Sequence, residues 1–416
     1  MLNLALHRPS LQSSLLPPWS AGRTCEEDAR GANNGQIYGH YGFHTASEPE
    51  PWWQVDLGDT FRLRAVALYN RRDMPHRLRR FSVLGSDDGR RWRVLARKAD
   101  DTVFGADGAP LRIDLPGAPA RFVRIRLDGT DFLHFCECQV YGEHPDPARH
   151  AQLVAGVEAA ARRRAYIAPG RRGRVIDFAG LAVFVDDAAY HPQVIAALDD
   201  GYYEAPERAA VARLVAPADR VLEVGTAIGV VSMTAAQITG AEAVMTFDAN
   251  PDIAADAADN FRRNGLDAIR GRVGLLKSRA AGAGDGDGET VPFHIDEQFW
   301  TSRLNATPDT PGIVRTVRIP VFCLEDAIAA HRATVLICDI EGGEVDLLRD
   351  ADLSALRLII METHYWSAGE LAIDRLVRRL VEAGFYPHLD HCQRHVLALR
   401  RHPEAISHPA AAALPP

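Results

Sequence analysis

The chain has 416 residues, of which 47% are hydrophobic and 25% are charged, and its formal net charge is -8. The composition is typical of globular proteins, and the length suggests two or three domains. The acidic balance argues against a nucleic-acid partner, because phosphate binding needs an excess of Lys and Arg on one face. We interpret the single basic cluster, residues 161–174, as a solvated segment, with a phosphate-bearing partner as the alternative.

Targeting signals and cysteine spacing indicate the compartment. The opening residues, MLNLALHRPSLQSS, lack the basic region, apolar stretch and cleavage site of a signal peptide. No apolar run approaches the roughly 20 residues of a membrane-spanning helix. The six cysteines include no C-x-x-C pair, which argues against a zinc site or a redox dithiol. We therefore expect free thiols, no membrane span and a cytoplasmic protein.

The first part of the chain, residues 1–143, contains short strand-like runs separated by Gly, Asp and Pro. The runs are WWQVDL, AVALYN, FSVLGS, RWRVLA, LRIDL, FVRIRL and CECQVYG. Strands at this spacing predict an all-β sandwich. A linker and a helix are predicted over residues 144–178, where the helical pattern is AQLVAGVEAAARRR.

The second part, residues 179–402, alternates apolar strands with helical patterns. The strands are RVLEVG, AVMTFD, TVLICDI and LRLIIME, and the helices between them include AADAADNFRRNG and AIDRLVRRLVEAG. This alternation predicts a parallel sheet with helices on both sides. The Gly- and Asp-rich residues 280–289 are predicted to form a mobile hairpin tip or lid, and residues 403–416 a disordered tail.

Four segments of the first part carry a family resemblance. They are NLALHRPSLQSS, ANNGQIYGHYGFHTASEPEPWWQVDLG, YNRRDMPHRLRRFSVLGSDDGRRW and FLHFCECQVYG. These segments resemble the discoidin, or coagulation-factor C-type, family, and most closely its fucose-binding F-type lectins. The resemblance implies a jelly-roll sandwich that binds a saccharide through His44, Arg71, Asp73 and Arg77, although Arg77 stands one position earlier than in the family motif.

The predicted saccharide site is chemically reasonable without the family. A sugar hydroxyl can accept a hydrogen bond from a cationic side chain and donate one to an imidazole, while an aromatic ring covers its apolar face. The alternative is that Arg71, Asp73 and Arg77 form a surface ion-pair network that only holds their loop. The sequence leaves both interpretations open.

The same resemblance implies a structural calcium ion and a disulfide. The calcium residues correspond to Asn34, Gln36 and Glu137, but Asn34 replaces the usual Asp and leaves fewer charges for a hard cation. The sequence therefore does not favour calcium. The disulfide expected at Cys136 cannot form, because Gly42 stands at the position of its partner.

In the second part, RVLEVGTAIGVVSM runs from a strand through a glycine turn into a helix. Gly225 lets the backbone pass close to a ligand, and Gly229 opens a helix whose first N–H groups can bind it. Asp248 ends the next strand, where it can accept ribose hydroxyls. Glu223 stands where a dinucleotide would place its pyrophosphate, so the pattern favours S-adenosylmethionine over a nicotinamide cofactor.

Residues 180–400 resemble the FkbM family of O-methyltransferases in these segments and in GYYEAPE, VRIPVFCLEDAI, CDIEGGEVDLL and RLIIMETH. The family usually has Asp at position 223 and Glu at position 248, and both exchanges keep the charge. The resemblance implies a Rossmann-like α/β fold and methyl transfer to a hydroxyl, commonly on a sugar, a polyketide or another secondary metabolite. The residues expected to bind the cofactor are Tyr203, Glu204, Glu223, Gly225, Thr226, Gly229, Asp248, Ala249 and Asn250.

Two neighbouring strands end in acidic residues beside a histidine. His364 is the predicted general base, because it follows a strand at its carboxyl end and imidazole titrates near neutral pH. Asp339 and Glu341 are predicted catalytic residues, and Asp339 and Glu362 with their neighbours could bind magnesium or manganese. The alternatives are that Asp339 lines a pocket, that Glu341 caps a helix starting at Gly342, and that His364 is structural.

Taken together, the two parts predict an S-adenosylmethionine-dependent O-methyltransferase that modifies a sugar, a glycan or a glycosylated metabolite. Its lectin-like domain would hold the saccharide near the active site and raise its effective concentration. The expected partner is therefore a saccharide or a glycosylated small molecule, and a homo-oligomer is left open. The alternatives are a carbohydrate-binding protein with a silent methyltransferase-like domain, a nicotinamide oxidoreductase, and a sandwich that serves only docking or dimerisation.

Overall fold

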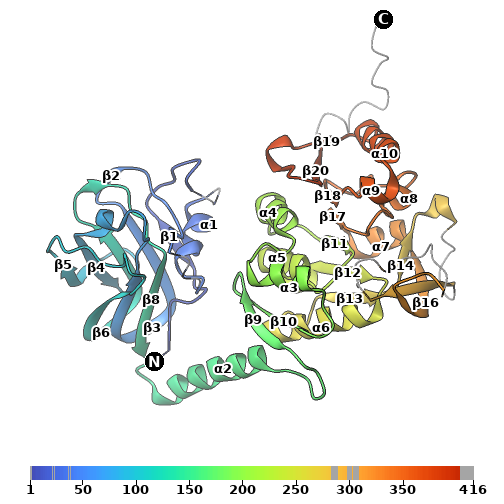
Figure 1. The fold of residues 1–416 in the computed structure, drawn as a ribbon. Helices are drawn as coiled ribbons and strands as arrows, with labels where there is room; N and C mark the ends of the chain where they lie inside the picture. Colours follow the sequence, from blue (N-terminus) through green and yellow to red (C-terminus); the bar gives the residue numbers. More distant parts are fainter. Residues whose placement is uncertain are drawn as a thin grey trace, which may run out of the picture. The chain divides into compact units, whose positions relative to one another are not determined.

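The computed structural model describes residues 2–402 except positions 21, 23, 36, 38, 283–288, 298–301 and 303–308. The chain divides into two compact units, Met1–Ala161 and Arg162–Pro416 (Figure 1). The predicted tail at 403–416 and most of the predicted lid at 280–289 lie outside the described residues. None of the described helices combines the length and the apolar composition that crossing a bilayer would require.

The first unit is a β-sandwich built on two long strands. β3 (Trp52–Tyr69) joins the predicted runs WWQVDL and AVALYN, and β6 (Leu111–Leu127) joins LRIDL and FVRIRL. The register between them shifts after Asp56 and again after Leu63, which are the positions where irregular pairing can bend the two strands. The other elements are β1 (Ser10–Gln12), α1 (Cys25–Ala29), β2 (Glu48–Pro49), β4 (Phe81–Ser86), β5 (Arg93–Lys98), β7 (Thr130–Asp131), β8 (Glu137–Glu143) and α2 (Pro147–Ala165).

Alternating burial along β3 makes the sandwich core. Trp53, Val55 and Leu57 are fully buried, whereas the residues between them point outward, as the period of two in a strand requires. A Cβ at Gly42 would lie 2.7 Å from the carbonyl oxygen of Cys136, so no side chain fits at this position. The described cysteines form no disulfide, as the sequence predicts.

The second unit contains a sheet flanked by helices. Its strands follow the order β13 (Arg270–Val273), β12 (Val244–Asp248), β11 (Val221–Val224), β17 (Val335–Cys338), β18 (Leu358–Glu362), β20 (Val396–Arg401) and β19 (Phe385–Pro387). The first five strands are parallel, but β20 is antiparallel to both of its neighbours. The sheet is therefore mixed: its first five strands form the predicted parallel sheet, and the antiparallel β20 is the departure from the prediction. The short connection from β19 to β20 explains the difference, because a parallel strand needs a long crossover.

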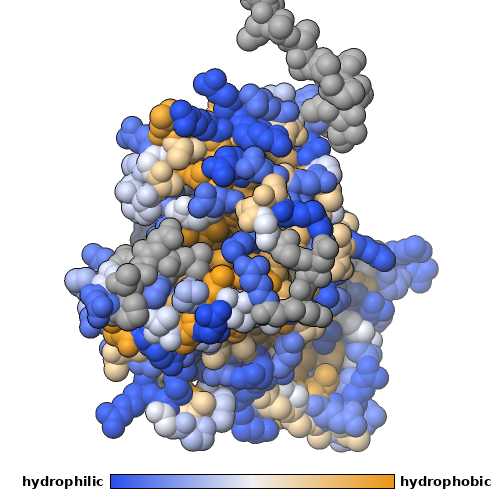
Figure 2. Space-filling model, turned by 90° about the vertical axis from the view of Figure 1, so that its right-hand side faces the viewer, coloured by the Kyte–Doolittle hydropathy of each residue, from blue (hydrophilic) through white to orange (hydrophobic). Residues whose placement is uncertain are grey.

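Helices cover both faces of this sheet, as predicted. One face packs against α4 (Ala205–Leu214), α5 (Val230–Thr239) and α6 (Pro251–Asn264), and the other against α7 (Leu324–His331), α8 (Glu344–Leu348) and α10 (Glu370–Glu382). On the face of the molecule drawn in Figure 2, hydrophobic side chains show among mainly hydrophilic ones. The remaining elements are β9 (Arg174–Phe178), β10 (Leu181–Val185), α3 (Pro192–Asp199), β14 (Leu275–Lys277), β15 (Thr290–Asp296), β16 (Ile313–Cys323) and α9 (Tyr365–Ala368).

The glycine turn after β11 is required by a close approach within the protein. Gly225 has φ of +92°, and a Cβ there would lie 1.7 Å from the carbonyl oxygen of Asp339. Gly229 has φ of +84° and precedes α5, where a Cβ would lie 2.5 Å from the ring of Phe261. Glycine is thus required at position 225 by the contact with the loop after β17 rather than by a ligand.

We predict that Gly225→Ala destabilises the second unit by roughly 3 kcal/mol or more, since the new methyl group overlaps a backbone carbonyl. Gly170→Ala is the matched control, because Gly170 has φ of +86° and open space around its Cβ position. It should cost only about 1 kcal/mol of left-handed backbone strain. Denaturant unfolding of both variants checks the difference, and equal losses would contradict the overlap.

Candidate functional site

Most of the predicted site residues of the second unit gather at one edge of its sheet. β11, β12, β17 and β18 are parallel and adjacent, so their carboxyl ends meet there. Ligands of open α/β sheets bind at this edge. The strand ends bring together Glu223, Asp248, Asp339 and Glu362.

Glu223 is buried behind the glycine turn, with a side chain only 1% exposed. Thr246 Oγ1 donates to its Oε2 at 2.9 Å, and the hydroxyl of Ser232 donates to the same oxygen. Burial raises the pKa of Glu223 to about 7, although the two hydroxyls act in the opposite direction. The carboxyl group is therefore not exposed towards a ligand, and a role for it in cofactor binding stays a prediction.

Asp248 is held in place by two backbone amides. Its Oδ2 accepts from the N–H of Ala227 at 2.9 Å, and its Oδ1 accepts from the N–H of Asn250 at 2.8 Å. Burial raises the pKa of Asp248 to about 6. These hydrogen bonds fix the carboxyl group at the end of β12, and its contact with a ribose stays a prediction.

Three other residues predicted at the cofactor have roles within the fold. The hydroxyl of Thr226 shares a hydrogen bond with that of Thr246. The Asn250 side chain caps α6 by accepting from the N–H of Asp252 at 3.0 Å. Ala249 packs against the small hydrophobic cluster of Phe293, Ile295 and Ile319.

The turn before α4 lies beside these strand ends. Burial raises the pKa of Glu204, and the nearby carboxylates of Glu207 and Glu223 raise it further. Burial also raises the pKa of Tyr203, as do the charges of Glu204 and Asp339. These electrostatic interactions locate the predicted pair Tyr203 and Glu204 close to the ends of β11 and β17.

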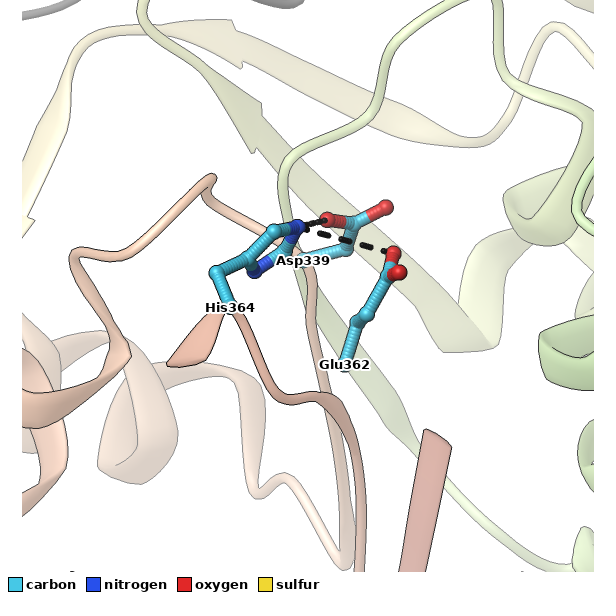
Figure 3. A group of neighbouring side chains, drawn as sticks. All are labelled: Asp339, Glu362 and His364. Carbon is cyan, nitrogen blue, oxygen red and sulfur yellow. Dashed lines mark ion pairs between the residues drawn. The ribbon is translucent and has the colours of Figure 1, made fainter. Parts of the chain in front are cut away.

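His364 stands at the centre of an acidic group (Figure 3). Its side chain is 1% exposed, and its Nδ1 lies 2.8 Å from Oε1 of Glu344. Its Nε2 lies 3.3 Å from Glu341 Oε2, 3.5 Å from Asp339 Oδ1 and 3.6 Å from Glu362 Oε2. Burial disfavours the charged imidazole, but the hydrogen bond to Glu344 and the surrounding carboxylates outweigh burial and raise the pKa of His364.

Glu344 is a site residue that the sequence reasoning missed. It is fully buried, and its Oε1 also accepts from the N–H of Ile340 at 3.0 Å. α8 begins at Glu344 after the N-cap Gly343, so the alternative that Glu341 caps a helix starting at position 342 is wrong. Glu341 instead has φ of +54° and directs its carboxylate towards His364.

The carboxylates around His364 raise one another's pKa. Burial raises the pKa of Glu341 to about 7 against the opposing effect of His364. Burial also raises the pKa of Asp339 and of Glu362, and the Glu362 charge adds to the effect on Asp339. Carboxylates this close favour a cation among them.

Exposed aromatic rings adjoin the buried histidine, and these were also missed. Trp366 is 55% exposed, and its ring centroid lies 5.1 Å from that of His364 and 5.1 Å from that of His395. Tyr365 is 39% exposed and packs edge-on against Trp366. Tyr365 and Trp366 directly follow the segment RLIIMETH. Their position beside His364 was therefore the only signal for them in the sequence.

In the first unit, the residues predicted to bind a saccharide lie close together. Arg71 Nε donates to Asp73 Oδ1 at 2.6 Å, and the Arg71 guanidinium lies 4.8 Å from the ring of Tyr41. Tyr41 packs edge-on against His44 at 5.3 Å. Burial lowers the pKa of His44, and the nearby charges of Arg71 and Arg77 lower it further. The Arg71–Asp73 part of the alternative ion-pair network is therefore present.

Arg77 has a different environment from Arg71. Its guanidinium lies 4.9 Å from the ring of Phe132, which also packs against His44. His134, which the sequence reasoning missed, is 1% exposed, and its ring lies 5.1 Å from that of His44. Burial lowers the pKa of His134 to about 3. The cluster thus offers neutral imidazoles, guanidinium groups and aromatic rings, as saccharide binding requires.

The residues that correspond to a calcium site do not fit this ion. Glu137 is fully buried, and its Oε1 accepts from the N–H of Gly35 at 3.1 Å. Burial raises the pKa of Glu137 to about 8, so this carboxyl is largely neutral near pH 7. Asn34 adds no charge, and Gln36 lies outside the described residues. A single, mainly neutral carboxyl is a poor donor set for calcium.

Comparison with known proteins supports the division into a lectin-like and a methyltransferase part. Residues 32–125 match the family model of the NedA-like, galactose-binding domain of the F5/F8 type C group. Residues 223–387 match the methyltransferase FkbM domain. Both predicted resemblances are therefore confirmed. The FkbM match gives the chain a methyltransferase domain, and this family implies the use of S-adenosylmethionine.

Solved structures similar to the first unit include several lectins. The fucolectin from striped bass (Morone saxatilis) serum is 27% identical, with 35% of this chain and 48% of that chain covered and a TM-score of 0.30. This chain thus spans about half of the fucolectin's length. The lectin domain of lectinolysin complexed with Lewis B antigen is 30% identical over 34% of this chain and 98% of that chain, with a TM-score of 0.29.

A fucose-binding module from Streptococcus pneumoniae is also similar. It is 27% identical, with 34% of this chain and 96% of that chain covered and a TM-score of 0.29. No curated protein matches the chain.

We predict that Glu137→Gln changes how the stability of the first unit depends on pH. The folded state keeps the Glu137 proton up to about pH 8, whereas the unfolded chain loses it near pH 4.5. Stability should therefore fall as pH rises between these values, by at most about 1.4 kcal/mol per pH unit.

In Glu137→Gln this contribution disappears. The free energy of unfolding of the variant should therefore rise relative to that of the wild type as the pH goes from about 5 to about 8. Denaturant unfolding across this range measures the difference, and a constant offset between the proteins would contradict a neutral Glu137. Added calcium should leave the same unfolding curves unchanged. If calcium stabilised the wild type and not the variant, this result would support a calcium site at Glu137.

Proposed function

We propose that the protein transfers a methyl group from S-adenosylmethionine to a hydroxyl group of a saccharide or a glycosylated metabolite, which its first unit helps to bind. One observation carries the proposal. The edge of the sheet that holds the glycine turn and Asp248 also holds His364 among its carboxylates, so the residues proposed for the donor and a proton-handling group share one edge of the sheet. The match to the FkbM methyltransferase domain supports the same reaction class.

The chain's own residues favour a positively charged donor. Asp248 can accept two ribose hydroxyls, and the N-terminus of α5 after Gly229 offers backbone N–H groups. Glu204 and Glu223 are acidic groups at this edge that, in their ionised forms, would attract an ammonium group and a sulfonium, and a cation bound there would in turn lower their raised pKa values. A dinucleotide would instead bring phosphate charges next to these carboxylates, which electrostatic repulsion opposes.

S-adenosylmethionine supplies the methyl carbon: the acceptor oxygen bonds to it, the carbon–sulfur bond breaks with its electron pair going to sulfur, and the hydroxyl proton is released. The residues around the hydroxyl then have two tasks. They align the oxygen and exclude water, which contribute much of the rate in such displacements. They also take up the proton, and His364 with Asp339 and Glu341 are the proposed catalytic group.

Trp366 offers a surface for the acceptor. Its exposed indole touches the ring of His364, so a molecule lying on it would reach the proposed catalytic group. Flat aromatic rings bury a large apolar area, and the less polar face of a sugar ring matches such a surface. This placement supports a saccharide acceptor in the second unit as well.

The second candidate function is saccharide binding with a silent second unit. The cluster around His44 favours it, because that cluster is complete without any contribution from the methyltransferase domain. Donor binding separates the two candidates, since a silent domain would bind no S-adenosylmethionine.

We predict that calorimetry shows one S-adenosylmethionine bound per chain and that Glu204→Gln weakens this binding about tenfold, because one carboxylate facing the donor is lost. Glu242→Gln is the control, since Glu242 is exposed on the surface. Transfer of labelled methyl to an acceptor mixture, followed by mass spectrometry, tests the reaction. Heat from NADH but none from S-adenosylmethionine would overturn the proposal.

We predict that Arg77→Ala lowers the affinity of the first unit for fucose- or galactose-containing glycans by tenfold or more, because a charged hydrogen-bond donor is removed. Arg90→Ala, which removes an exposed arginine elsewhere on the sandwich, should leave glycan binding unchanged. A glycan array with both variants measures this. Equal glycan binding by wild type and Arg77→Ala would exclude Arg77 from the site, and no glycan binding by either protein would favour a sandwich that serves only docking or dimerisation.

A further inference from the structure

We infer that Asp339, Glu362 and His364 form a binding site for one divalent metal ion, with manganese as the best match, next to the proposed acceptor hydroxyl. The metal's part in the reaction rests on the proposed function, whereas the binding site itself rests on the side chains alone.

The three side chains converge from two neighbouring strands. One ligand atom from each lies within 4.8 Å of the others, and Figure 3 shows His364 Nε2 facing the carboxylates of Asp339 and Glu362. Octahedral ligands about 2.1 Å from a metal are about 3 to 4 Å from one another. Pairing of β17 with β18 holds the two backbones in register, so small side-chain rotations would close the site around an ion.

The buried histidine is an observation separate from the acidic side chains. His364 is 1% exposed, and its Nδ1 lies 2.8 Å from the fully buried Glu344, which as a carboxylate can only accept. A hydrogen on Nδ1 satisfies Glu344, and Nε2 faces three carboxylate oxygens within 3.6 Å. A proton on Nε2 meets these oxygens in the absence of metal, and a metal ion that takes the place of this proton would be bound by Nε2 and the carboxylates together. A carboxylate that orients a histidine in this way is the usual outer partner of a metal ligand.

The charge of the surroundings also calls for a cation. Besides the three proposed ligands, Glu341, Glu344, Glu204 and Glu207 contribute to the electrostatics of the same edge. A bound donor offers one sulfonium and one ammonium against its own carboxylate, so it would compensate only part of the charge that these carboxyl groups carry when they are ionised. A divalent ion would neutralise two further charges.

The ligand set indicates which metal the site would prefer. Two carboxylates and one imidazole combine the oxygen ligands that suit magnesium and manganese with a nitrogen that manganese accepts more readily. The side chains of Asp339 and Glu362 are 26% and 24% exposed, so one side of the site remains open to an acceptor. A metal-bound hydroxyl loses its proton more easily. His364 would then act as a ligand rather than as the free base.

The test measures manganese binding by the full-length chain after removal of metals with a chelator. Electron paramagnetic resonance should show one Mn²⁺ per chain, and Asp339→Asn and Glu362→Gln should each weaken binding by tenfold or more. Asp346→Asn is the control, because Asp346 is an exposed carboxylate on the adjacent helix α8. Unchanged affinity in both ligand variants would overturn the inference.

A second measurement does not depend on the folding of those variants. Spin-echo modulation from an imidazole nitrogen should appear in the wild-type Mn²⁺ complex and disappear in His364→Gln. Absence of this nitrogen signal in the wild type would exclude His364 as a ligand and overturn the site.

Activity separates this inference from the proposed function. Methyl transfer that continues at an unchanged rate after chelation would refute the metal's part in the reaction and leave His364 as the base, with the proposed function intact. Stoichiometric Mn²⁺ binding without any methyl transfer would support the metal site and count against the proposed function. Activity lost on chelation and restored by Mn²⁺ would support both.

Discussion

The close approach of the turn after β11 to the loop after β17 is the constraint on which the second unit depends. The backbone at Gly225 passes so near the carbonyl of Asp339 that no side chain fits between them. The N–H of Asp339 also donates to the carbonyl of Val224 at 2.9 Å. These contacts bring the glycine turn and the acidic residues after β17 together. The proposed reaction needs both within one pocket.

Much of the fold could be predicted because its patterns are local. The alternation in WWQVDL and the apolar strands around Glu223 follow from the periods of strands and helices, which neighbouring residues determine. The merging of runs into β3 and β6 could not be predicted, because only pairing with a partner shows that a strand continues through a bend. The direction of β20 depends similarly on its short connection from β19.

The residues of the candidate site also divide into those that the sequence could predict and those that it could not. Glu223, Asp248 and His364 were accessible from the sequence, since each ends or follows an apolar strand within a recognisable segment. Glu344 was not, because it reads as an ordinary first-turn residue of a helix. The role of Glu344 depends on its contact with His364, which lies twenty positions further along the chain and is brought to it only by folding. His134 and Trp366 likewise gain their significance from neighbours in space.

Three backbone positions at this edge adopt a conformation that costs side-chain-bearing residues about 1 kcal/mol or more each: Glu204, Ala227 and Glu341 have φ of +46°, +45° and +54°. Glycine would remove the backbone strain at each position. The native chain is therefore less stable than it could be, and it keeps these side chains and amides in place. A programme of thermostabilisation guided by backbone geometry alone would choose these positions first. Glycine at these positions would yield a protein with higher stability but lower function. These three residues should therefore be left unchanged in such a programme.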